Sequence, residues 1–268
     1  MSNQKYLMES DEEILRLELK TDVNIVQEQA KWAGLKSGMR LADLGCGPGL
    51  TTSILHKLVN PNGESVGVDF SEQRCNYAES NYKTKGLEFV CRDIRESLED
   101  LGLFDFIWVR FVLEYYLNDS FSIVKNIIKI LKPGGTLCLI DLDHNCLNHF
   151  GIPKKLERTI FKISDELQIK ANFDPFVGRK LYSFLYDLHF ENIKVDIKAH
   201  HNIYGKLNKK DEFNFLKKIE IAPQKIKFKF DDYKNYKEFI NETRNCFRNE
   251  RRFTYTPIIL CKGVKPFS

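Results

Sequence analysis

The sequence predicts an α/β fold in which helices cover both faces of a mostly parallel β-sheet. Helix-like and strand-like hydrophobic periods alternate along the chain, which is the pattern of such a sheet. Three successive strand-like runs also end in an aspartate, and the first of them leads into a glycine-rich turn. The 268 residues, of which 43% are hydrophobic, can form one buried core, so we expect a single domain over residues 1–268. The expected strands lie near 39–44, 65–69, 87–91, 105–109, 135–141, 192–199 and 255–262.

The first expected element is a helix from about Ser10 to Ala33. Its apolar residues recur at helical spacing and would form one stripe, made of Ile14, Leu17, Val23 and Val26. Residues 1–34 are therefore expected to form a helical cover ahead of the first strand.

The first strand leads into LADLGCGPGLTT, residues 41–52, where three glycines stand at alternate positions. Glycine is needed where the backbone turns with positive φ or lies against a ligand without a Cβ in between. The segment resembles motif I of the class I S-adenosylmethionine-dependent methyltransferases. This resemblance implies S-adenosylmethionine as the cofactor and a set of cofactor-binding residues in the loop: Asp43, Gly45, Cys46, Gly47 and Gly49.

A dinucleotide-binding loop is an alternative, because its G-x-G-x-x-G pattern also follows a strand. Here Leu50 stands where the third glycine of that pattern would fall, and Pro48 removes a backbone donor that a phosphate would need. S-adenosylmethionine carries no phosphate, and the acid at Asp43 suits its ammonium group. An ordinary glycine-rich turn between strand and helix is the other alternative for this segment taken alone.

Acidic side chains end the next two strand-like runs. Asp69 lies about twenty residues past the glycines, where a carboxylate can accept hydrogen bonds from both hydroxyls of a ribose. The same spacing would suit NAD. The resemblance implies that Phe70 lies against an adenine face, that Asp93 accepts from the adenine amino group and that Ile94 donates its backbone N–H.

Later segments extend the resemblance over roughly residues 35 to 200. In ILKPGGTLCLIDLD, residues 130–143, a helix ending before Pro133, a Gly-Gly turn and an apolar strand are typical of the approach to the fifth strand. Residues 104–115 and 174–195 are similar to the segments around the fourth and sixth strands in small-molecule members, of the ubiquinone/menaquinone-methyltransferase-like type. The resemblance implies a Rossmann-like sheet of seven strands whose last strand inserts antiparallel beside the sixth.

Two segments, 145–180 and 205–252, interrupt this pattern and are expected to form helical lid insertions over an acceptor pocket. Ligands of open α/β sheets bind beyond the carboxyl ends of the strands, which is the edge beside which both segments would lie. Four aromatic side chains of the first segment are candidates to line that pocket: Phe150, Phe161, Phe173 and Phe176. Packing of the lid onto the core is their alternative role.

Three residues are candidates for a catalytic role. Tyr115 matches the place after the fourth strand where related enzymes carry a histidine or tyrosine facing the methyl group, although its unperturbed pKa near 10 favours orienting the acceptor over proton removal. Histidine ordinarily titrates near neutral pH, which makes His144 a candidate base, with a plain surface histidine as the alternative. Glu114 adjoins Tyr115. Arg110 is expected to bind the cofactor, and Arg16 of the N-terminal cover could either reach the methionine carboxylate or stay solvated.

Composition narrows the remaining classes. The seven cysteines are odd in number and form no C-x-x-C pair, which indicates neither a disulfide framework nor a zinc site and favours a reducing cytoplasm. The acidic start of the chain argues against a secretory signal, and no apolar run is long enough to span a bilayer. The net charge of +4 is mild and its lysine clusters are interrupted by acids, so a nucleic-acid partner is not favoured.

The sequence therefore predicts an enzyme that transfers methyl from S-adenosylmethionine to an O, N or C atom of a small molecule. VRFVLEYY follows the expected fourth strand in place of the D/N-P-P-Y or Pro-Cys motifs of base-modifying methyltransferases. A tRNA or protein methyltransferase, and a cofactor-binding module without turnover, are the alternatives. The acceptor and the oligomeric state are not readable from the sequence.

Overall fold

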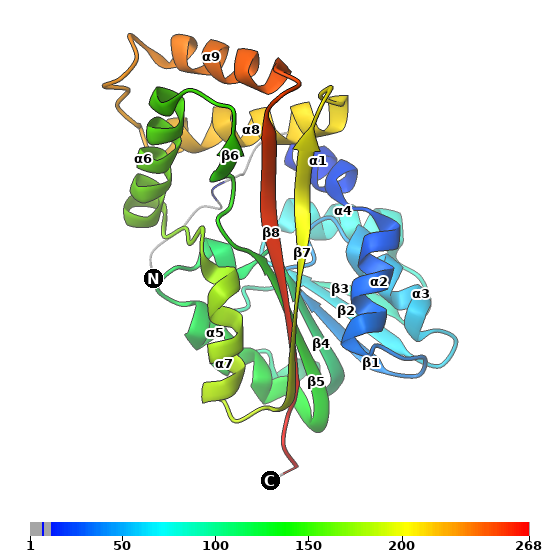
Figure 1. Ribbon diagram of the computed structural model, residues 1–268. Coiled ribbons are helices and arrows are strands. Elements are labelled where there is room, and N and C mark those ends of the chain that lie inside the picture. The colour runs from blue at the N-terminus through cyan, green and yellow to red at the C-terminus, as the bar shows by residue number, and fades with distance from the viewer. Residues whose placement is uncertain (1–6, 8–11, 268) are drawn as a thin grey trace.

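In the computed structural model, which describes Leu7 and residues 12–267, the chain folds around one mixed sheet of eight strands (Figure 1). The first five strands pair in parallel in the order β3-β2-β1-β4-β5. β8 then pairs antiparallel with β5, β6 and β7. The strands are β1 (Arg40–Leu44), β2 (Glu64–Asp69), β3 (Leu87–Cys91), β4 (Phe104–Arg110), β5 (Leu131–Leu142), β6 (Asn148–Phe150), β7 (Glu191–Tyr204) and β8 (Phe253–Val264).

Helices cover both faces of this sheet. One face packs against α5 and α7, and the other packs against α2 and α3. The helices are α1 (Glu13–Lys20), α2 (Val23–Ala33), α3 (Leu50–Val59), α4 (Glu72–Tyr82), α5 (Ser120–Ile127), α6 (Lys154–Ala171), α7 (Leu181–Asp187), α8 (Lys209–Lys225) and α9 (Tyr236–Arg248). Short 3-10 turns lie at Glu99–Leu101, Leu113–Tyr115, Ile128–Ile130 and Val177–Lys180.

The central strands are buried on both faces, which is why they read as continuous apolar runs. In β4, for example, Ile107 packs into one of the two cores and Trp108 into the other, and both side chains are fully buried. Parallel sheets in two-sided α/β folds need such strands because alternate residues face opposite helix layers. The predicted α/β class with a mostly parallel sheet is confirmed, and so is the antiparallel last strand.

Two expected elements differ from the structure. The N-terminal helix is two helices. α1 ends at Lys20 with an extended Thr21 as its C-cap, and Asp22 begins α2 by accepting hydrogen bonds from the backbone N–H groups of Asn24 and Ile25. The expected apolar stripe therefore does not form, since Val26 is buried while Val23 is 45% exposed. Ser10, the expected first residue of the helix, lies outside the described residues.

The sheet also extends further than expected. The seven expected strands lie at their expected places, and the short strand β6 adds an eighth. β6 pairs with the first residues of β8, beyond the segment of β8 that pairs with β5. Gly134 and Gly135, expected as a turn before the fifth strand, lie within β5 beside an irregularity in its pairing with β4. The added strand length carries the chain from the sheet to the helices above it.

A separate group of helices lies beyond that end of the sheet, at the top of Figure 1. α6, α8 and α9 pack on one another around their own apolar cluster, which includes Leu156, Ile160, Phe215, Phe239 and Phe247. We name these three helices the lid. They fall within the two segments expected to form insertions. Among the described residues, none of the helices is long and apolar enough to cross a membrane.

Candidate functional site

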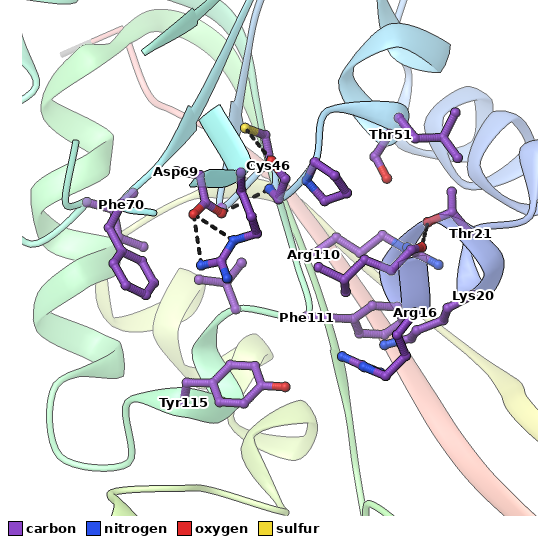
Figure 2. A pocket seen from close by; sticks show the side chains of 18 of the residues that line it. Arg16, Lys20, Thr21, Cys46, Thr51, Asp69, Phe70, Arg110, Phe111 and Tyr115 are labelled. Carbon is purple, nitrogen blue, oxygen red and sulfur yellow. Dashed lines mark hydrogen bonds and ion pairs between the residues drawn. The ribbon is translucent and has the colours of Figure 1, made fainter. Parts of the chain in front are cut away.

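A pocket opens where the carboxyl ends of β1, β2 and β4 meet, and we name it the strand-end pocket (Figure 2). Its space is about 930 Å³ including the open mouth. The lining residues come mainly from α1, the glycine loop, α4 and the segments after β2, β3 and β4. Those that carry the argument below are Arg16, Leu17, Lys20, Gly45, Cys46, Gly47, Asp69, Phe70, Arg74, Ile94, Arg110, Phe111 and Tyr115.

The glycine loop brings bare backbone to the floor of this pocket. Gly45 has φ +84°, and a Cβ built on it would lie 2.3 Å from Cγ2 of Val112. Both the conformation and the close approach exclude other residues, so this glycine is required where the loop passes the segment after β4. Gly47 also has a positive φ, and a Cβ built on it would lie 3.5 Å from the side chain of Leu17 in α1. Gly49 does not line the pocket but caps the N-terminus of α3.

Asp69 ends β2 and faces the loop across the pocket. Its Oδ2 accepts from the backbone N–H of Gly47 at 2.9 Å. Its Oδ1 accepts from the backbone N–H of Ser71 and forms a buried ion pair with Arg74 of α4, at 3.0 Å from the guanidinium. The carboxylate is therefore held in one position between loop and helix, at the place where the sequence predicts a hydroxyl acceptor.

Beyond Asp69 the pocket offers a flat apolar surface. Phe70 is 41% exposed and lines the pocket beside Ile94. Asp93, expected to contact an adenine amino group, does not line it and instead pairs with Arg95. Burial raises the pKa of Asp93, but the hydrogen bonds from Arg95 outweigh that effect and lower it.

The opposite end of the pocket is basic. Figure 2 shows Arg16, Lys20 and Arg110 gathered around the ring of Phe111, across the pocket from Asp69 and Phe70. The charged groups of Lys20 and Arg110 each lie 4.1 Å from the centre of that ring. Burial and the neighbouring cations, Lys218 first among them, lower the pKa of Lys20 well below its usual value. Burial likewise lowers the pKa of Arg110 to about 10, although attraction to Asp43 and Asp141 opposes it.

Helix α1 covers this basic end and is fastened to two other elements. The hydroxyl of Tyr82 in α4 donates to Glu18 of α1 at 2.7 Å, and Lys217 of α8 forms an ion pair with Glu12. Arg16 is buried, and its guanidinium donates to both carboxylate oxygens of Glu13, at 2.7 Å each. Arg16 therefore lines the pocket as a fixed, paired cation, in contrast to the solvated alternative.

Asp43 lies behind the glycine loop and does not line the pocket. It is 2% exposed, and its Oδ2 accepts from the hydroxyl of Thr52 at 2.7 Å. Burial raises its pKa to about 7, against the opposing effects of Thr52 and Arg110. Through the hydroxyl of Thr52, this acid supports the first turn of α3.

This raised pKa predicts a pH-dependent stability in the cofactor-free protein. The pKa of Asp43 is about 7 in the folded protein, against 3.8 in the unfolded chain. The stabilisation from its protonated carboxyl is therefore fully present below pH 4 and is lost as the pH rises through 7. The variant Asp43→Asn cannot ionise, so we expect its stability relative to the parent protein to increase from pH 5 to pH 8 by a few kcal/mol. Urea unfolding of both proteins at the two pH values measures this, and an equal difference at both would contradict it.

The candidate catalytic residues fall in three different surroundings. Tyr115 lines the strand-end pocket (Figure 2). Glu114 is buried beneath it, where its Oε2 accepts from the side-chain amide of Asn145 at 2.7 Å. His144 lines neither this pocket nor the one described next, and its ring packs edge-on against Phe176 at 5.0 Å between centres.

A second pocket lies under the lid, and we name it the lid pocket. Its space is about 590 Å³ including its mouth, and Tyr115 lines it as well as the strand-end pocket. Most of its wall is apolar and comes from α6, α8 and the segment after β5: Leu147, Ile160, Ile163, Leu167, Phe173 and Ile219. Of the four aromatic residues expected here, only Phe173 lines it. Phe150 and Phe161 are exposed, and Phe176 packs on His144.

Sequence reasoning missed several residues of the two pockets. Lys20 follows Arg16 by four residues and so shares its helix face, a spacing that could have found it. Arg74 and Phe111 gave no such signal, because only the folded chain brings them to the pocket. Lys218, Asn145 and Ser164 of the lid pocket were also missed, since they lie far apart in the sequence.

Known proteins match the part of the chain that contains the glycine loop and the strand-end acids. A family model described as a methyltransferase domain matches residues 35–178. The chain is 31% identical over 152 residues to a demethylmenaquinone methyltransferase of Lactococcus lactis, covering 56% of this chain and 55% of that protein. The chain spans about half the length of the curated relatives it matches.

Solved structures extend the likeness over most of the chain. Phosphoethanolamine N-methyltransferase 2 of Haemonchus contortus, in complex with S-adenosyl-L-methionine, has a TM-score of 0.58 at 16% identity, covering 99% of this chain and 60% of that one. Coclaurine N-methyltransferase, bound to N-methylheliamine and SAH, has a TM-score of 0.52 at 19% identity, covering 90% and 72%. These two similarities establish the fold alone. Because the family model matches more than half of the chain, the protein belongs to the methyltransferase-domain family, as its glycine loop and strand-end acids predict.

Proposed function

We propose that the protein transfers a methyl group from S-adenosylmethionine to an O, N or C atom of a small molecule. The observation that carries this proposal is the pair of adjoining pockets, which have different surfaces and share Tyr115. The strand-end pocket is polar and charged at both ends, whereas the lid pocket is mostly apolar. Two substrates could therefore occupy the two pockets at once and meet at Tyr115.

The residues of the strand-end pocket fit S-adenosylmethionine. Asp69 would accept from the ribose hydroxyls, and Phe70 with Ile94 would hold the adenine. The basic end at Arg16 and Arg110 would bind the carboxylate of the methionine part, and the bare backbone at Gly45 and Gly47 would let that part lie close to the floor. The contact of Asp93 with the adenine amino group stays a prediction, as do the roles of Cys46, Asp43 and Gly49.

When bound, S-adenosylmethionine supplies an electrophilic methyl group on a positively charged sulfur. The protein then has to hold an acceptor in line with that group and keep water away. Such alignment is worth on the order of 7 to 11 kcal/mol in well-oriented reactions. The walls formed by α1 over the strand-end pocket and by the lid over the second pocket support both tasks.

Proton removal is the second requirement when the acceptor is a hydroxyl or an ammonium group. Tyr115 lines both pockets and is proposed to orient the acceptor. Glu114 reaches this region through Asn145 and is proposed to hold that amide in place. His144 as a general base stays a prediction, since it lies against Phe176.

An acceptor screen tests the proposed function. The purified protein is incubated with S-adenosylmethionine and a metabolite library, and release of S-adenosylhomocysteine is measured with the mass of the product. We expect one class of small molecules to gain a single methyl group. Binding of S-adenosylhomocysteine without turnover of any small molecule would contradict the proposal and favour a binding module. Methylation of tRNA or a protein alone would contradict it as well.

Once an acceptor is found, Tyr115→Phe separates orienting from proton transfer. An orienting role predicts a lower kcat with the pH profile and the Kd for S-adenosylhomocysteine unchanged. A proton-transfer role predicts that the limb of the pH profile assigned to this group disappears, a contribution of about 10² to 10⁴ in rate.

We also propose a cytoplasmic location and no nucleic-acid partner. All seven cysteines are free thiols, which supports a reducing compartment. Basic side chains of the late segment are paired with acids, as in Lys217–Glu12 and Arg244–Glu220, which lowers the charge available to a phosphate backbone.

A further inference from the structure

The lid pocket contains a polar patch at its side nearest Glu114. Lys218 of α8 lies with its Nζ 3.3 Å from Oδ1 of Asn145 and 3.7 Å from Sγ of Cys146. The side-chain nitrogen of Asn145 in turn donates to Glu114. Because a carboxylate can only accept, this contact turns the amide oxygen toward Lys218 and fixes the patch in one orientation.

Lys218 retains donor capacity that the described residues do not use. An ammonium group carries three donors, and only the amide oxygen and the weakly accepting thiol lie near. No carboxylate of the described part of the chain lies within ion-pair distance of Lys218, whereas its neighbour Lys217 is paired with Glu12. A cation placed in a largely apolar pocket without a counter-charge would be matched by an anionic ligand.

A second observation points to a polar ligand in the same pocket. Within the described part of the chain, the hydroxyl of Ser164 in α6 has no hydrogen-bond partner, and Ser164 is only 6% exposed. Ser164 lines the lid pocket from the helix that packs against α8. A buried hydroxyl without a partner is costly, and a ligand oxygen that accepts from it would remove that cost.

The surrounding charges act in the same direction. The rings of His200 and His201 lie 4.4 Å apart between their centres; His200 packs on Phe111, and His201 contacts the hydroxyl of Thr256. Burial is the main reason that the pKa values of both histidines are lowered well below the usual range. The cations Lys20 and Lys218 lower both pKa values further, so positive charge from α1 and α8 acts on this pair of histidines.

We propose that the lid pocket selects acceptors with an apolar body and an anionic oxygen group, a carboxylate or a phenolate, which Lys218 and Ser164 bind. This inference rests on the proposed function, because it names the substrate class of the same site. The apolar wall holds the body of the acceptor, and the patch holds its charged end. A cationic amine would meet repulsion at the same place.

Binding to the protein saturated with S-adenosylhomocysteine tests this selection. The probes are decanoate, decan-1-ol and decylamine, which share a chain length and differ in charge, and their affinities are measured by calorimetry at pH 8. We expect decanoate to bind at least tenfold more tightly than decan-1-ol, and decylamine to bind most weakly. Equal affinities for decanoate and decan-1-ol, or tightest binding of decylamine, would overturn the proposal.

Variants assign the preference to named residues. Lys218→Met should lose at least tenfold in decanoate affinity while its affinity for decan-1-ol changes less than threefold. Lys217→Met is the matched control and should keep the preference, since Lys217 lines neither pocket. Ser164→Ala tests the patch from the other helix should Lys218→Met not fold, and it should weaken decanoate threefold or more. A decanoate preference that survives both lid-pocket variants would contradict the assignment.

The acceptor screen distinguishes this inference from the proposed function. Methylation of a neutral or cationic small molecule, with no acidic one accepted, would sink the selection proposed here and leave methyl transfer intact. The absence of any small-molecule turnover would instead remove the proposed function.

Discussion

Asp69→Ala is expected to lose both cofactor affinity and stability. The carboxylate is the proposed acceptor for two ribose hydroxyls, and leaving such groups without a partner in a closed site costs about 1 to 3 kcal/mol, or roughly 5- to 150-fold in Kd. The same substitution removes the carboxylate from Arg74, whose side chain is 4% exposed. Breaking a buried ion pair costs about 3 to 5 kcal/mol in stability. Calorimetry with S-adenosylhomocysteine and urea unfolding measure the two losses.

A double variant keeps this prediction testable if Asp69→Ala does not fold. Adding Arg74→Met removes the buried charge, so the double variant should regain stability without regaining affinity for S-adenosylhomocysteine. Glu64→Gln is the control, because that acid begins β2, is 67% exposed and pairs with Arg40, and neither residue lines the strand-end pocket. Unchanged affinity in the double variant would remove Asp69 from the cofactor site.

Gly45→Ala is expected to disrupt the strand-end pocket at its floor. The new Cβ would lie 2.3 Å from Cγ2 of Val112, at a backbone φ of +84°. The conformation costs an alanine about 1 to 2 kcal/mol, and overpacking adds about 1 to 3 kcal/mol. Because relief requires the loop to shift against the segment after β4, we expect the affinity for S-adenosylhomocysteine to fall at least tenfold.

The chain supplies a matched control for the backbone conformation. Gly38 has the same φ of +84° but no atom within 4 Å of a built Cβ. Gly38→Ala should therefore show only the conformational cost in urea unfolding, with normal cofactor affinity. Val112→Ala combined with Gly45→Ala removes the clashing methyl groups and should restore part of the affinity. Equal losses in Gly38→Ala and Gly45→Ala would show that the close approach to Val112 does not matter.

The sequence by itself determined where the strands lie along the chain and that a pocket forms at their carboxyl ends. Gly45, Asp69 and Ile94 lie in it as expected, because they follow strands that are adjacent in the sheet and end at the same edge. Such residues are encoded locally, by a strand and the turn that follows it. The antiparallel last strand was predictable too, but from the resemblance to a family and not from a local pattern.

Tertiary packing alone decided which acids face the pocket and which support it. Asp43 and Asp69 have similar positions at strand ends, yet Asp43 is enclosed behind the loop by Thr52 while Asp69 faces the loop and Arg74. Asp93 pairs with Arg95. The direction of a side chain at a strand end depends on which neighbouring groups can satisfy it, and those groups come from other elements.

The lid pocket was decided entirely by tertiary structure. The sequence indicated that residues 145–180 and 205–252 are insertions, but the wall of the pocket combines α6, α8 and the segment after β5 with Tyr115. Helical periodicity shows which face of each helix is apolar, but it does not show which faces meet. Lys218, Asn145 and Ser164 are therefore placed together only by the packing of α6 and α8 above the sheet.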